Sequence, residues 1–276
     1  MKKEKVLITV KTYPTLSSKY GELVCTAGIR ASDGEWIRIY PMPFRSLKED
    51  FRYKKYQWVN IELQKNKQDH RIDSYRPVNI HDLELLDSIP TSDGWNARKR
   101  IVLNPKHLYF SLDSLLAETK AGNRSIAVFK PAKFIDFRVE SVDREWEENK
   151  LRGCKALLSQ PGLFDEGHLK EIRPVEKIPY KFKIKFSDES GKESTMMVED
   201  WEICELYRKC IRSSDSEEEA VDKVRKKYES FMYEKDLYLI LGTTKAWHSI
   251  APNPYIIIGL FYPPFEIQRS FVFGDY

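Results

Sequence analysis

Residues 236–261 read Asp-Leu-Tyr-Leu-Ile-Leu-Gly-Thr-Thr-Lys-Ala-Trp-His-Ser-Ile-Ala-Pro-Asn-Pro-Tyr-Ile-Ile-Ile-Gly-Leu-Phe. Two β-rich apolar runs, 237–241 and 255–261, bracket a loop at 242–254. Apolar runs of this length are typical of strands that are buried on both faces, at the centre of a sheet. The other expected elements are amphipathic, so we interpret them as layers that cover this strand pair.

The bulk composition indicates a folded protein with a core rich in aromatic rings. Of the 276 residues, 41% are hydrophobic, 13% are aromatic and 32% are charged. No uninterrupted apolar run approaches about 18 residues, so we expect no membrane span. The N-terminus leads straight into a β-like stretch without a signal-peptide pattern, and the four cysteines are scattered, with no Cys-x-x-Cys pair. We therefore expect a cytoplasmic protein with free thiols and no metal or cofactor.

Charge is distributed unevenly along the chain. The net charge of the whole chain is +4, but residues 1–140 carry a balance of +8 and residues 141–276 a balance of −4. A basic half joined to an acidic half is expected where the basic half meets an anionic partner. The acidic half could support the core or dock a protein partner. Ordinary solvated surface is the alternative interpretation of so modest an excess.

The first half is rich in expected strands. Strands are predicted at 5–12, 22–31, 35–40, 57–63, 125–129 and 134–140, and short helical pieces at 81–88 and, capped by Ser111, at 112–120. The hairpin 22–40 turns at Ser32-Asp33-Gly34. A three-residue loop with left-handed Gly34 would pair Ile29 with Ile37 and keep each face of the hairpin uniform in polarity.

The second half alternates strands with helices. A charged, helical connector is expected at 141–175, followed by strands at 180–186 and 193–198 and amphipathic helices at 199–213 and 217–234. A last short strand is predicted at 268–273. The sequence thus predicts an α+β fold. It has a β-rich basic subdomain at 1–140 that resembles a small barrel, the connector, and an α+β subdomain at 176–276 with central strands 236–242 and 255–261.

One face of the predicted hairpin interleaves cations with aromatic rings. This pattern suits single-stranded nucleic acid, because bases stack on rings and cations hold phosphates. The alternative is that Trp36 and Tyr40 are buried under another layer and that the arginines pair with acids. The candidate contacts on the hairpin and on the segment after it are Arg30, Trp36, Arg38, Tyr40, Arg45, Arg52, Lys54 and Lys55.

The loop after the first central strand is a further candidate site. It places Lys245, Trp247 and His248 after a small, hydroxyl-bearing turn, and loops at the ends of core strands often carry function. The P-loop pattern Gly-x-x-x-x-Gly-Lys-Ser/Thr is absent, so an NTPase is not supported. A lone histidine beside a tryptophan is more often packed or solvated than catalytic.

Catalytic candidates are few. Asp69-His70-Arg71 offers an acid, a possible general base and a cation, and Asp136 followed by Glu148-Asn149-Lys150 matches a loose nuclease spacing that falls on an expected helix. His248 completes the set. No Gly-x-Ser-x-Gly, Gly-x-Gly-x-x-Gly or Cys/His metal pattern is present.

The leading hypothesis is therefore a nucleic-acid-binding protein, DNA or RNA and more readily single-stranded, without a hydrolytic centre of its own. The first alternative is an enzyme that acts on nucleic acid or nucleotides, with Asp69, His70, Asp136 and His248 as its candidate residues. The second is a scaffold subunit of a larger complex.

Overall fold

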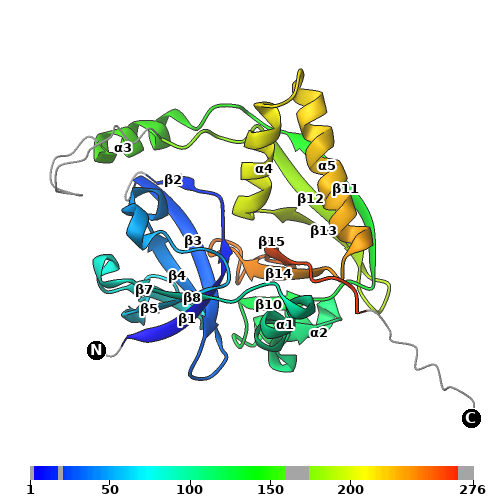
Figure 1. The fold of residues 1–276 in the computed structure, drawn as a ribbon, viewed down its shortest axis with the longest axis horizontal. Helices are drawn as coiled ribbons and strands as arrows, with labels where there is room; N and C mark the ends of the chain where they lie inside the picture. Colours follow the sequence, from blue (N-terminus) through cyan, green and yellow to red (C-terminus); the bar gives the residue numbers. More distant parts are fainter. Residues whose placement is uncertain (1–2, 18–20, 159–173, 267–276) are drawn as a thin grey trace, which may run out of the picture.

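The computed structural model describes residues 3–17, 21–158 and 174–266. Two mixed β-sheets lie beside each other, with helices on the outer side of the second (Figure 1). This arrangement confirms the predicted α+β class, including the curled, barrel-like first sheet. Among the described residues, none of the helices combines the length and the apolar composition needed to cross a membrane.

The first sheet has the strand order β6-β7-β4-β3-β1-β5-β8, with β2 paired to β3. Its neighbours are antiparallel except β4 and β7. Its strands are β1 (Glu4–Lys11), β2 (Thr15–Ser17), β3 (Gly21–Arg30), β4 (Trp36–Met42), β5 (Gln57–Ile61), β6 (Leu63–Lys65), β7 (Ser74–Pro77) and β8 (Glu84–Ser88). The prediction of a helical piece at 81–88 is wrong. Apart from a 3-10 turn (Ile80–Asp82), the segment forms β8, because pairing with β5 outweighs its local helix propensity.

The second sheet has the order β11-β12-β13-β15-β14-β10-β9. Its strands are β9 (Leu108–Tyr109), β10 (Ile126–Phe129), β11 (Lys133–Ser141), β12 (Tyr180–Ser187), β13 (Glu193–Val198), β14 (Tyr238–Thr243) and β15 (Tyr255–Phe261). The predicted central pair is confirmed, since β14 and β15 are interior strands. The second sheet also contains β9, β10 and β11. The chain therefore passes from the first sheet to the second before residue 140, the position at which the sequence predicted a boundary.

The described helices are α1 (Asn96–Val102), α2 (Leu112–Lys120), α3 (Glu148–Leu158), α4 (Trp201–Ile211) and α5 (Glu217–Glu234). Three of them begin at side-chain caps that satisfy free backbone N–H groups, Ser111 for α2, Asp200 for α4 and Ser216 for α5. Of the connector expected at 141–175, the helix that the structure describes spans Glu148–Leu158. The strand predicted at 268–273 lies outside the described residues. Helices α4 and α5 cover the second sheet (Figure 1).

The strands β14 and β15 are buried on both faces because they separate two cores. Leu239 and Ile257 face the core under α4 and α5, while Ile240 and Ile258 face the layer between the two sheets. Residues from the first sheet, including Ile29 and Trp36, complete that inner layer. This packing explains why the apolar runs are unbroken: the usual alternation needs one wet face, and neither strand has one.

The register expected for the β3–β4 hairpin is wrong by one residue. The loop does have left-handed Gly34, but Arg30 pairs with Glu35, and Ile29 lies opposite Trp36 rather than Ile37. The prediction assumed one apolar and one polar face. Both faces are in fact buried, one in the core of the first sheet and the other between the sheets, so polarity does not select the register.

Candidate functional site: a polar cleft between the sheets

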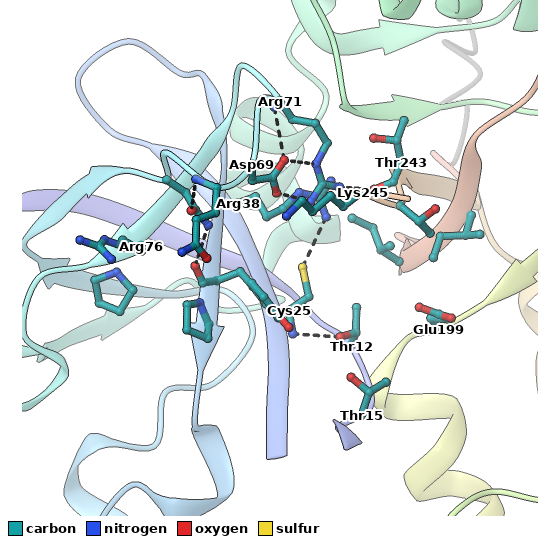
Figure 2. Close-up of a pocket in the computed structure, with 18 of the residues that line it drawn as sticks. Thr12, Thr15, Cys25, Arg38, Asp69, Arg71, Arg76, Glu199, Thr243 and Lys245 are labelled. Atoms are coloured by element: carbon teal, nitrogen blue, oxygen red, sulfur yellow. Dashed lines mark hydrogen bonds and ion pairs between the residues drawn. The ribbon is translucent and has the colours of Figure 1, made fainter. Parts of the chain in front are cut away.

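A cleft of about 540 Å³ opens at one end of the layer between the two sheets (Figure 2). This volume lies within the range of about 300–1,000 Å³ that is usual for ligand pockets. Both sheets and the segments that follow their strands contribute to it. The polar and aromatic residues that line the cleft are Thr12, Thr15, Cys25, Arg38, Tyr40, Gln64, Asn66, Gln68, Asp69, Arg71, Arg76, Glu199, Thr243, Thr244 and Lys245.

Arg71 is the most firmly held cation of the cleft. Its Nε donates to Oδ1 of Asp69 at 2.9 Å and its Nη2 to Oδ2 at 2.5 Å. Its Nη1 donates to the backbone carbonyl of Thr243, so the loop between β6 and β7 is tied to the end of β14. Burial would raise the pKa of Asp69, but the hydrogen bonds and the charge of Arg71 outweigh it and lower that pKa to about 2.

Arg38 lies deeper in the same wall and is only 3% exposed. Its charge faces Asp73, whose Oδ1 is 4.0 Å from Nε, and its Nη1 approaches Sγ of Cys25 at 3.4 Å. The hydroxyl of Ser125, which directly precedes β10 of the second sheet, donates to Asp73. The Nε of Arg38 is buried without a hydrogen-bond acceptor among the described residues. Arg38 therefore retains donor capacity beside the cleft.

Two cations of the cleft are exposed. Arg76 on β7 and Lys245 after β14 line the cavity, and neither has an ion-pair partner within residues 3–17, 21–158 and 174–266. Glu199 lines it as well, set apart from the arginine group in Figure 2. Burial raises the pKa of Glu199, and its carboxylate has no hydrogen-bond partner in the part of the chain described. These three side chains are available to a ligand.

The hairpin surface predicted from the sequence is largely covered. Trp36 is 3% exposed and packs between the sheets, and Arg38 is equally buried. Their strand face is covered by the second sheet, which no pattern within the hairpin reveals. Tyr40 is half-buried but does line the cleft.

Most of the neighbouring cations are engaged within the protein. Arg30 pairs with Asp33, Arg45 with Glu22, and Lys55 with Asp200 and Glu202. Arg52 donates to the backbone carbonyls of Leu47 and Arg45, although it is exposed, and Lys54 is exposed. None of these five cations lines the cleft. The basic segment 44–56 thus serves largely to join the two halves and to brace its own turns.

Three of the four catalytic candidates come together. Asp69 and His70 lie on the β6–β7 loop, which meets the loop after β14, and the rings of His70 and His248 are 5.6 Å apart between centroids. Asp136 is elsewhere, on β11, where it pairs with Arg138. Trp247 is 58% exposed on the same loop as His248.

Arg76 and Glu199 were not among the site residues expected from the sequence. Arg76 precedes Pro77, and Glu199 directly follows the strand β13; both look like ordinary exposed charges when read along the chain. For Glu199, the only sign of a site in the sequence was a lone carboxylate at the end of a core strand. Within the described residues, no group of three His, Cys, Asp or Glu side chains is placed to hold a metal ion.

Comparison with known proteins gives families without an assigned activity. Residues 2–104 match a domain of unknown function (DUF8758), and residues 108–274 match a second one (DUF8757). No curated protein matches the chain. One solved structure, described as a murine DNA binding protein bound with double-stranded DNA, aligns at 8% identity over 98% of this chain and 100% of that one, with a TM-score of 0.32, which is too low to bear on function. Since the second match spans more than half of the chain, the chain belongs to the DUF8757 family.

Proposed function

We propose that the protein binds single-stranded nucleic acid across the cleft between its two sheets. The observation that carries this proposal is a pair of exposed cations on one cleft, Arg76 from the first sheet and Lys245 from the loop after β14, neither with an ion-pair partner in the part of the chain that the structure describes. Behind them, Arg71 and Arg38 are fixed in the wall by Asp69 and Asp73. Cations so placed attract a polyanion, and holding them in advance reduces the entropy lost on binding.

Rings at the cleft and beside it support nucleic acid over a simple anion. Tyr40 lines the cavity, and Trp247 stands exposed two residues after Lys245. A base stacked on such a ring contributes about 1–3 kcal/mol, whatever its sequence. Gln64 on the cleft wall adds an amide group that can donate to or accept from base edges.

The test is the affinity for labelled oligonucleotides, measured by fluorescence anisotropy across a salt series. We expect binding to weaken steeply between about 50 and 200 mM salt, because phosphate contacts release counterions. Arg76→Gln and Lys245→Gln should each lower the affinity and reduce the salt slope by about 0.7 for a single strand. Lys133→Gln removes an exposed cation on β11, outside the cleft, and should change neither quantity.

Two outcomes would contradict the proposal. The first is an affinity that the cleft variants and Lys133→Gln alter equally, since binding would then be diffuse. The second is a mononucleotide that binds as tightly as an oligonucleotide of about ten nucleotides, because the occupied site would then be a small-molecule pocket.

A further inference from the structure

The loops that carry His70 and His248 form one structured unit at the surface. The β6–β7 loop is closed by hydrogen bonds from Asp69 N to Asn66 O and from Ser74 N to Arg71 O. The loop after β14 is held by hydrogen bonds from Trp247 N to Thr244 O and from Ala251 N to Trp247 O. Arg71 then joins the two loops through the carbonyl of Thr243. The backbone of both loops therefore holds the two histidines next to each other, with their ring centroids 5.6 Å apart.

Each imidazole is oriented by a hydroxyl group. His248 Nδ1 is 2.9 Å from Oγ1 of Thr243, and His70 Nε2 is 3.2 Å from Oγ of Ser249. The other ring nitrogen of each histidine has no partner among the residues described. Two oriented imidazoles, each with one nitrogen available, match what proton transfer to and from a bound group requires.

The two rings differ in their surroundings. His70 is exposed to water. His248 is half-buried; burial lowers its pKa, and the nearby charges of Arg71, His70 and Arg38 lower it further, with Asp73 opposing them. The lowered pKa of His248 favours the neutral imidazole, which can accept a proton. Two imidazoles in different surroundings can divide the roles of base and acid.

We propose that His70 and His248 cleave single-stranded RNA by general acid–base catalysis, an inference that rests on the binding proposed above. His248 takes the proton from a ribose 2′-hydroxyl, and the 2′-oxygen attacks the adjacent phosphorus. The new P–O2′ bond forms as the P–O5′ bond breaks, and His70 gives its proton to the departing 5′-oxygen. The products are a 2′,3′-cyclic phosphate and a 5′-hydroxyl; exchange with water resets both imidazoles. Lys245, on the same loop as His248, provides a cation for the phosphate.

The experiment uses the full chain and an oligodeoxynucleotide with a single ribonucleotide, so that only one bond has a neighbouring 2′-hydroxyl. Binding is measured by anisotropy and products by mass spectrometry, with EDTA present. We expect cleavage only at the ribonucleotide, yielding the cyclic phosphate. His70→Ala and His248→Gln should each slow it by about 100-fold or more while binding is retained. His81→Ala, which removes an exposed histidine outside the pair, should leave the rate unchanged.

The rate should follow a bell-shaped pH profile, because one imidazole acts as base and the other as acid. Each variant should lose one limb of this profile, which the loss of a purely structural role would not cause. Binding without cleavage would overturn this inference and leave the proposed function standing, whereas absence of binding would overturn both. Equal cleavage of all-deoxy substrate, lost in Ser249→Ala, would identify Ser249 as a nucleophile and refute the transfer to the 2′-hydroxyl. Loss of cleavage with EDTA would refute it as well.

Discussion

Arg71 donates two hydrogen bonds to Asp69 and a third to the backbone carbonyl of Thr243, 172 residues further along the chain. Through this one guanidinium, the β6–β7 loop of the first sheet is attached to the end of a central strand of the second. The cleft and the histidine pair both lie at this junction. Arg71 is consequently both a structural tie between the sheets and a wall of the candidate site.

Replacing Asp69 tests the tie. Asp69→Asn leaves the charge of Arg71 buried with only an amide and the Thr243 carbonyl as described partners, and we expect the free energy of unfolding to fall by about 3 kcal/mol. Urea denaturation followed by circular dichroism measures it. Asp136→Asn breaks an exposed pair with Arg138 and should cost no more than about 0.5 kcal/mol. Equal effects in the two variants would mean that the tie contributes nothing beyond a surface pair.

The contribution of Asp69 should depend on pH. Its pKa is about 2 in the folded chain, against an ordinary value of 3.8. Because the folded-state pKa is the lower one, the stabilisation is fully present above the ordinary value and is lost as the pH falls through about 2. The difference in unfolding free energy between the native chain and Asp69→Asn should therefore shrink when measured at successively lower pH. A difference that stays constant from neutral to acid pH would contradict this assignment.

Lys55 makes a second tie between the halves. Its Nζ lies 3.0 Å from Asp200 Oδ2 and 3.0 Å from Glu202 Oε2, and its side chain is nearly as buried as that of Asp200. Lys55→Met should destabilise the chain by about 3–5 kcal/mol, because Asp200 is left as an uncompensated buried charge.

The double variant Lys55→Met/Asp200→Asn provides the control. The change Asp200→Asn removes that charge, and the new amide oxygen can still accept the hydrogen bond from Glu202 N that begins α4. Denaturation should show that the double variant regains part of the lost stability. A double variant that is less stable than Lys55→Met would show that the charge itself is not the cause.

Gly28 lies where the first sheet leaves no room for a side chain. A Cβ at this position would lie 2.3 Å from the carbonyl oxygen of Leu7 and 2.8 Å from Cγ1 of Val6. Gly28→Ala should therefore cost about 3 kcal/mol or more, since a backbone atom cannot move aside cheaply. At Gly259 the nearest side-chain atom would be 3.3 Å away, so Gly259→Ala should lower the unfolding free energy less. Thermal or urea unfolding of the two variants decides the order.

Variants of Trp36 and Trp247 distinguish binding on the hairpin from binding at the cleft. Trp36→Phe keeps a ring in the layer between the sheets and should leave oligonucleotide affinity unchanged, because no ligand reaches a side chain 3% exposed. Trp247→Ala should weaken binding about tenfold through loss of a stacked base. Anisotropy titration of both variants measures the effect. A stronger loss in Trp36→Phe, with folding intact, would restore the hairpin as the binding surface.

Local chemistry was sufficient for much of the fold. The unbroken apolar runs predicted that β14 and β15 are central, and the cap Ser111 marked the start of α2. These features depend on neighbours within a few residues, so they can be read along the chain. The docking of a protein partner on the acidic half stays a prediction.

The tertiary structure alone decided which surfaces are open. Alternation showed that Trp36, Arg38 and Tyr40 share a strand face, but the layer covering Trp36 and Arg38 comes from strands about a hundred residues or more away, so the hairpin register and its burial could not be inferred locally. Asp69, His70 and His248 were singled out as separate residues. The hydrogen bonds from Arg71 to Thr243 and between His70 and Ser249 bring their loops together, and contacts across such a separation follow from packing between sheets rather than from spacing in the sequence.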